Sequence, residues 1–340
     1  MHFPLKGLFQ DVFRTAAPII ITLFVTAYIA TLAFYQKYVH HSEPAFNFYS
    51  TSVVKVRILP QNLPYAVQGT FNNVIEGQRK VVQSGTDSAG IYALPFEVNS
   101  PRQATVYVEG EAIEIFIIPD STLTLQVQLN PQGGTLDSIT FTGATAQICK
   151  YYRLKNQVFG SSKLKSIKHT AHSESLREYG KMLDSLTQKE DTFIDKMREE
   201  MKLPTWFCDF EKNELMYQKA YLKRSHAGNE AVPAGYFDNV PADKKEAVFS
   251  YYYYLYLNSL ISQQIKITTS PADTSAKSAL LKQLSVADTL LKSETHDVFI
   301  TRAIFAQIQK GNEAFAKELF HQFGNFKEQR YYRFLKMKLK

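Results

Sequence analysis

An uncharged apolar run, residues 16–35 (AAPIIITLFVTAYIATLAFY), constrains this chain more than any other feature of its sequence. At about 1.5 Å rise per residue, a helix of this length spans roughly 30 Å, the thickness of a bilayer core. A buried core helix does not need so long an uncharged run beside basic flanks. We therefore expect a transmembrane helix that tethers the rest of the chain to the lipid bilayer through residues 16–35.

The charges that precede the run predict its orientation. Lys6, Arg14 and the amino terminus outnumber Asp11, which favours a cytoplasmic location for residues 1–15. A cleavable signal peptide is the alternative, because residues 31–33 (TLA) resemble a small-residue cleavage site. The apolar stretch of a signal peptide is normally shorter, about 7 to 15 residues. We expect an uncleaved anchor with the bulk of the chain outside the cytoplasm.

Residues 46–143 have the alternating pattern and the turn signals of an all-β domain. In residues 121–129 (STLTLQVQL) every second side chain is apolar, which is typical of a strand with one buried face. Two further β-rich segments flank Glu109-Gly110, which predicts a tight hairpin turn. Short strands with no helix between them predict an antiparallel β-sandwich.

From Gly143 onward the apolar spacing changes to three and four residues, which predicts that residues 144–335 are all helical. One long helix is expected to open at residues 173–175, although Glu190 interrupts its apolar stripe. That stripe covers only about three heptads, so we expect packing within the chain rather than a coiled-coil dimer. The predicted fold class is an N-terminal transmembrane helix followed by an α+β body, an antiparallel β-sandwich domain (46–143) and then an all-α domain (144–335).

The composition and the motifs argue against several classes of function. The net charge is +7, but the basic residues are scattered among acidic ones, which favours solvated surfaces over nucleic-acid binding. There is no nucleophile elbow, phosphate-binding glycine loop or dinucleotide fingerprint. The histidines, His296 among them, lack partners at metal-ligand spacing and are expected on the surface. We predict no enzymatic activity, no catalytic, cofactor-binding or metal-binding residues, and no cofactor.

Two other groups of residues suggest a site but have simpler explanations. The tyrosine run 251–254 covers all sides of a helix, which predicts core and boundary packing rather than a ligand site. Carboxylates are adjacent at 190–191, at 199–200 and around Glu211, yet neighbouring residues diverge on a helix and nothing in their spacing marks a pocket.

The chain has two cysteines, Cys149 and Cys208, and they do not form a CxxC motif. A disulfide between them is possible in an oxidising compartment, and thiol–disulfide chemistry would require a thiolate with a lowered pKa. A lone cysteine behaves most often as a small buried hydrophobe. Two free thiols are therefore the favoured interpretation.

Three segments carry a resemblance to a known family. They are residues 115–125 (IFIIPDSTLTL), residues 139–144 (ITFTGA) and residues 204–211 (PTWFCDFE). In this order they resemble the N-terminal accessory region of membrane-anchored thioredoxin-like proteins of Gram-negative bacteria, the TlpA-type thiol-disulfide oxidoreductases. That family continues into a thioredoxin domain with a WCxxC site, whereas the single tryptophan here is Trp206 and no CxxC exists.

The resemblance implies an accessory module without its catalytic partner domain, in a single-pass protein of the inner membrane with its bulk in the periplasm. The leading hypothesis is a non-catalytic interaction module with a protein partner in the cell envelope, such as a thioredoxin-like protein. One alternative is a thiol–disulfide redox protein that uses Cys149 and Cys208. The other is a binder of a small peptide or glycan in the cleft between the sandwich and the helices.

Overall fold

The computed structural model describes Thr26 and most of the chain after residue 49. The described ranges are 50–60, 64–86, 90–130, 135–160, 175–228, 236–237, 240–248, 250–268 and 275–340. The chain divides into two compact units, Met1–Glu43 with Pro204–Phe207 and Pro44–Leu203 with Cys208–Lys340. The sheets, the helical core and the cavity presented below all belong to the second unit.

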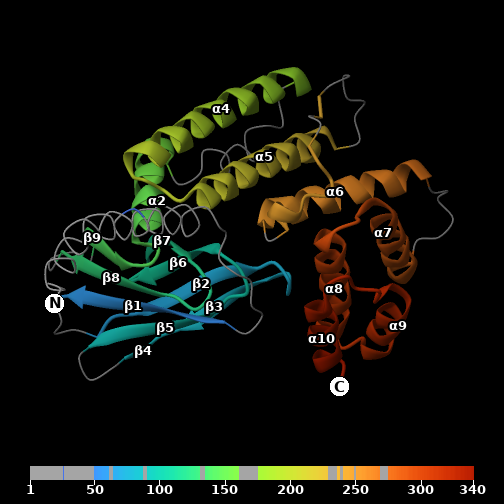
Figure 1. Cartoon of the computed structure of the whole chain (residues 1–340), viewed down its shortest axis with the longest axis horizontal. Coiled ribbons are helices and arrows are strands. Elements are labelled where there is room, and N and C mark those ends of the chain that lie inside the picture. The colour runs from blue at the N-terminus through green and yellow to red at the C-terminus, as the bar shows by residue number, and fades with distance from the viewer. Residues whose placement is uncertain are drawn as a thin grey trace, which may run out of the picture. The chain divides into compact units, whose positions relative to one another are not determined.

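In the described residues, β-strands occupy the chain from Thr51 to Gly143 and form two sheets (Figure 1). The first sheet has the strand order β4-β5-β1-β8-β9 and the second has the order β3-β2-β6-β7. The bounds are β1 (Thr51–Leu59), β2 (Val67–Asn73), β3 (Gln78–Gln83), β4 (Gly85–Thr86), β5 (Ile91–Glu97), β6 (Arg102–Val108), β7 (Glu111–Ile117), β8 (Thr122–Leu129) and β9 (Leu136–Gly143).

The two sheets share one apolar core, as the alternating sequence pattern predicts. Along β1 every second side chain is buried, Val54, Val56 and Ile58 among them, and β8 shows the same alternation. Phe71 of β2 and Phe96 of β5 contact each other across the two sheets with ring centroids 5.8 Å apart. The sandwich is therefore held by side chains from alternate positions of both sheets.

The prediction of a wholly antiparallel sandwich is wrong at one pair of strands. β1 and β8 run parallel, with Val53 opposite Thr122 and Leu59 opposite Gln128. The other paired strands run antiparallel. Parallel neighbours need a long crossover, and here strands of both sheets separate β1 from β8 along the chain. Alternation predicts which face of a strand is buried, but it says nothing about the direction of its neighbour.

Helices follow the strands, so the α+β order of strands first and helices second is confirmed (Figure 1). The long helix predicted after residue 173 begins with a capping box, in which the Ser175 side chain accepts from the Glu178 backbone N–H. The bounds are α2 (Ala146–Phe159), α4 (Leu176–Glu200), α5 (Thr205–Ala227), the 3₁₀ turn η2 (Lys245–Ala247), α6 (Tyr251–Thr268), α7 (Ala276–Leu290), α8 (Glu294–Gln309), α9 (Glu313–Phe323) and α10 (Gln329–Lys338).

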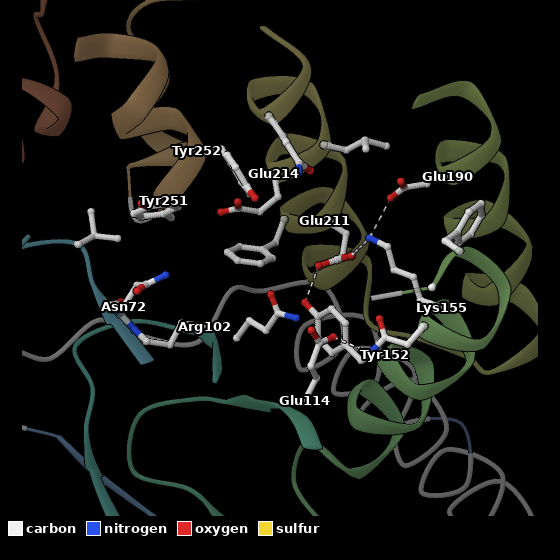
Figure 2. Close-up of a pocket in the computed structure, with 18 residues that line it drawn as sticks. Asn72, Arg102, Glu114, Tyr152, Lys155, Glu190, Glu211, Glu214, Tyr251 and Tyr252 are labelled. Atoms are coloured by element: carbon white, nitrogen blue, oxygen red, sulfur yellow. Dashed lines mark hydrogen bonds and ion pairs between the residues drawn. The ribbon is translucent and has the colours of Figure 1, made fainter. Parts of the chain in front are cut away.

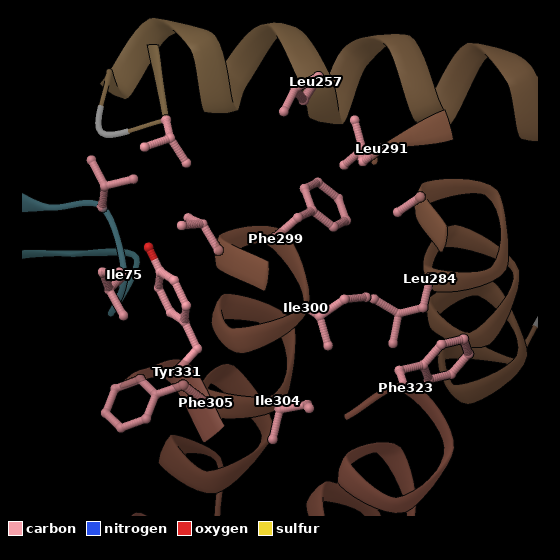
Figure 3. Packing of buried hydrophobic residues seen from close by; sticks show 14 of the residues in the cluster. Ile75, Leu257, Leu284, Leu291, Phe299, Ile300, Ile304, Phe305, Phe323 and Tyr331 are labelled. Carbon is pink, nitrogen blue, oxygen red and sulfur yellow. The ribbon is translucent and has the colours of Figure 1, made fainter. Parts of the chain in front are cut away.

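The second apolar core lies among α5 to α10 and includes a turn of the sandwich. Val74 and Ile75, between β2 and β3, are buried in this core, and Figure 3 shows Ile75 among its side chains. The Arg302 guanidinium of α8 donates a hydrogen bond to the Val74 carbonyl at 2.9 Å and stacks over the ring of Tyr254. The β2–β3 turn therefore fixes the sandwich to the helices.

The C-terminal helix α10 lies mostly within the predicted helical region 144–335 and extends three residues beyond it. Its buried side chains Tyr331, Phe334 and Leu335 have helical spacing, but they stand among basic residues in a helix of only ten residues. The Tyr331 hydroxyl donates to the Glu294 carboxylate of α8 at 2.6 Å, which anchors the helix. A contact with a distant helix, rather than a strong local pattern, defines this element.

No helix in the described part of the chain is both long and apolar enough to span a bilayer. The longest ones, α4 and α5, carry charged side chains throughout their length. This finding counts against the predicted transmembrane helix and the predicted single-pass inner-membrane location, since none of the described helices supplies such a span. Residues 1–15 and, apart from Thr26, residues 16–35 lie outside the described residues.

Candidate functional site

A buried cluster of polar side chains joins helices α2, α4 and α5 (Figure 2). Glu211 of α5 accepts hydrogen bonds from the hydroxyls of Tyr151 and Tyr152 of α2, at 3.1 and 2.5 Å. The Lys155 Nζ lies 2.9 Å from a carboxylate oxygen of Glu211 and 3.3 Å from one of Glu190 of α4. One lysine therefore holds two carboxylates from two other helices. We call these five residues the Glu211 network.

The Glu211 network keeps a charged centre in a buried place. Burial alone would lower the pKa of Lys155, but the carboxylates of Glu211 and Glu190 more than offset this and raise it. Burial and the charge of Glu211 raise the pKa values of Tyr151 and Tyr152, so both remain neutral hydrogen-bond donors. Both carboxylate oxygens of Glu211 therefore have donors, which restrict the movement of this side chain.

A cavity of about 230 Å³ opens beside the Glu211 network, between the sandwich and the helices. A single water needs only about 10–15 Å³ by a comparable measure, so the cavity can hold a small organic ligand. Figure 2 shows that its walls come from elements far apart in the sequence. They include Asn72 and Arg102 from the sandwich side and Lys155, Glu211, Glu214 and Tyr252 from the helices.

Arg102, the first residue of β6, is a buried cation on the sandwich side of the cavity. Its guanidinium donates to the carbonyls of Asn72 and Ser100, to the Ser100 hydroxyl and to the Asn99 side chain. No ion pair with a carboxylate is found for Arg102 within the described ranges. Burial lowers its pKa to about 10, while the charge of Glu214 acts in the opposite direction. Four of its five N–H groups are thus already occupied.

Glu214 of α5 is the carboxyl of the cavity whose pKa is clearly shifted. Burial and the charge of Glu211 raise its pKa to about 7. Hydrogen bonds from the Ser250 hydroxyl and the Tyr251 backbone N–H, at the start of α6, act against this rise. Glu214 makes no ion pair with any residue that the structure describes. Its charge is therefore only partly compensated.

The two cysteines are free and fully buried, as the favoured interpretation predicts. The Cys149 sulfur lies against the β7 backbone, 3.4 Å from the Phe116 nitrogen. Burial raises the pKa of both thiols, Cys149 and Cys208, to about 11. Neither thiol lines the cavity. Thiols of this kind are poor nucleophiles, because the thiolate is the reactive form.

His296 is buried, so its expected place on the surface is wrong. Its ring nitrogens lie 3.2 Å from Asp297 and 3.0 Å from Asp288. The remaining Asp297 oxygen accepts from the Glu328 backbone N–H, which leads into α10. The described residues contain no group of three or more side chains arranged to hold a metal ion. We interpret this cluster as a structural tie between helices.

The side chains that form the cavity were not predicted from the sequence to have a functional role. Glu190 stood out only as an interruption of an apolar stripe, and Glu211 as one of several adjacent carboxylates. One signal was available. Tyr151, Tyr152 and Lys155 lie on the inner stripe of α2. Each of two later helices carries a carboxylate, Glu190 or Glu211, at a position expected to be buried. A buried charge needs a partner, so these residues could have been paired. Of the tyrosine run, Tyr253 is buried in the core as predicted, whereas Tyr251 and Tyr252 line the cavity.

Comparison with protein-family models, with curated proteins and with solved structures finds no match to this chain. The resemblance to the accessory region of TlpA-type proteins therefore stays a prediction. The fold and the cavity are the observations from which a function can be proposed.

Proposed function

We propose that this chain is a non-catalytic binding module whose cavity, between the sandwich and the helices, holds a small polar ligand. The observation that carries the proposal is the cavity of about 230 Å³ beside the Glu211 network. Ligand sites are typically concave, with a few polar groups whose positions are set before the ligand arrives. The ion pairs and hydrogen bonds of Lys155 and Glu211 supply this preorganisation.

The side chains at the cavity support binding rather than catalysis. The described lining contains no serine, threonine, cysteine or histidine that could act as a nucleophile. Glu190 and Glu211 are both held by Lys155, which leaves them poorly placed to transfer protons. Glu214 has a raised pKa, but the described lining gives it no serine, threonine, cysteine or histidine to activate. The thiol–disulfide alternative has less support, because Cys149 and Cys208 are buried with raised pKa values. A protein partner remains compatible with the proposal if a short segment of it enters the cavity.

A cavity-filling variant tests the proposal. Gln218 of α5 is half-buried and lines the cavity, so Gln218→Trp should occupy the space that a ligand needs. Gln188→Trp adds the same side chain at an exposed position of α4 and serves as the control. Binding would be measured by ligand-observed NMR over a panel of small acids, amines, sugars and short peptides.

We expect at least one class of compound to bind saturably to the unaltered protein and to Gln188→Trp. The affinity of the same class should fall tenfold or more in Gln218→Trp. If no class binds, or if Gln218→Trp binds as well as the unaltered protein, the proposal is wrong. Circular dichroism of both variants would show that the fold is retained.

A further inference from the structure

The net charge of the side chains that line the cavity has the opposite sign to that of the whole chain. The chain has a net charge of +7. Among the described side chains that line the cavity, however, carboxylates outnumber cations, four glutamates against Lys155 and Arg102. A pocket with a low-dielectric wall concentrates the field of its own charges, so the local excess of carboxylates decides which ligand enters.

The charges of the cavity are unequally compensated. Lys155 holds Glu190 and Glu211, and Glu114 accepts a hydrogen bond from the Asn156 amide at 2.7 Å. Glu214 receives two hydrogen bonds from the start of α6 and feels the charge of Lys155, but it makes no ion pair within the described ranges. An ionised carboxylate has about four acceptor positions, so Glu214 can accept further donors from a ligand.

Aromatic rings stand beside the partly compensated carboxylate of Glu214. Figure 2 shows Tyr252 next to Glu214 on the helical side of the cavity, and the charge of Glu214 contributes to the raised pKa of Tyr252. Tyr251 also lines the cavity, is 38% exposed, and meets the ring of Tyr252 edge-on at 5.6 Å. A carboxylate beside aromatic faces is the combination that attracts organic cations, since ring faces carry negative potential.

We propose that the ligand of this cavity is a small organic cation, whose ammonium group donates to Glu214 and lies against Tyr251 and Tyr252. This inference rests on the proposed function and names the chemical class of the ligand. Arg102 is not the recognition group, because its donors are occupied by neighbouring oxygens. An anionic ligand would meet Glu114, Glu190, Glu211 and Glu214 with little positive charge left to hold it.

Three probes of equal length separate charge from shape: 1,4-diaminobutane, 1,4-butanediol and succinate. Isothermal titration calorimetry of the full chain at pH 8 should show diaminobutane binding at least tenfold tighter than the diol or the diacid. The amide acetyl-Gly-Lys-Gly-NH₂ presents the same ammonium on a peptide. Its binding, compared with that of diaminobutane, distinguishes a peptide side chain from a free amine as the source of the cation.

Glu214→Gln removes the charge and keeps the shape, so we expect diaminobutane affinity to fall tenfold or more. Glu199→Gln, at an exposed position of α4 outside the cavity, should stay within twofold of the unaltered protein. Binding of succinate or the diol as tight as that of diaminobutane would overturn the inference, as would unchanged affinity in Glu214→Gln. If a neutral or acidic compound binds and Gln218→Trp abolishes that binding, the proposed function stands and the cation inference is wrong.

Discussion

Replacing Lys155 by methionine tests whether the Glu211 network holds helices α2, α4 and α5 together. The ammonium lies 2.9 Å from Glu211 and 3.3 Å from Glu190, and the exposed fractions of these two side chains are 5% and 10%. At an effective dielectric constant of about 20, each contact is worth about 5 kcal/mol before desolvation is subtracted. Methionine has a similar length but no charge, so it leaves two carboxylates without their cation.

Removing one partner of a buried ion pair typically costs about 3–5 kcal/mol, because the remaining charge stays desolvated and unpaired. We expect a loss of this size in the free energy of unfolding of Lys155→Met, measured by urea denaturation at pH 7. Lys277→Met provides the control, since Lys277 lies 2.8 Å from Glu318 but the two side chains are 54% and 49% exposed. An exposed pair contributes about 0–1 kcal/mol.

The pH dependence of the loss checks its cause. In Lys155→Met, one of the two carboxyls should take up a proton in the folded state more readily than in the unfolded state. The folded variant then gains stability relative to the unaltered protein as the pH falls, so the loss should shrink from pH 7 to pH 5. A loss no larger than that of Lys277→Met, or one that grows as the pH falls, would refute the role given to the network.

Two further predictions concern the β9 terminus and the cavity. Gly143 has φ +112°, and a Cβ there would lie 2.4 Å from the Thr122 carbonyl oxygen, whereas Gly110 has φ +86° with open space around it. Gly143→Ala should therefore lower the free energy of unfolding by about 2–5 kcal/mol and Gly110→Ala by about 1 kcal/mol; equal losses in urea denaturation would contradict the clash. Burial and Glu211 raise the pKa of Glu214 to about 7, so the folded state binds this proton more tightly than the unfolded state. Stability should fall as the pH rises from about 5 to 8, by at most about 3 kcal/mol, and Glu214→Gln should flatten that part of the profile; an unchanged profile in the variant would show that another group is responsible.

Local patterns in the sequence predict most elements of this fold. The alternation in residues 121–129 becomes β8, and the helix expected after residue 173 begins at Ser175 with its capping box. The change of period at Gly143 coincides with the end of β9 and the start of α2. These features depend on residues a few positions apart, so a linear reading can detect them.

Relations between distant segments account for what the sequence did not predict. The parallel pairing of β1 with β8 depends on the course of the chain between them, not on either strand. Helix α10 is held by two carboxylates of α8. Glu294 accepts a hydrogen bond from the Tyr331 hydroxyl, and Asp297 accepts one from the Glu328 backbone N–H just before the first turn of α10. The predicted membrane span falls on residues 16–35, and among the described residues no helix is long and apolar enough to take that role.

The cavity is the extreme case of dependence on distant segments, because its walls come from both the strands and the helices. The β2–β3 turn reaches into the helical core through Ile75 and is held by Arg302, while the Glu211 network joins α2 to α5. These two sets of contacts help to set the spacing between Arg102 on the sandwich side and Glu214 on the helical side of the cavity. A bound cation would add a third tie between Glu214 and the rings of α6. The same contacts that stabilise the fold therefore determine the size and the charge of the site, which explains why neither could be recognised in any single stretch of the sequence.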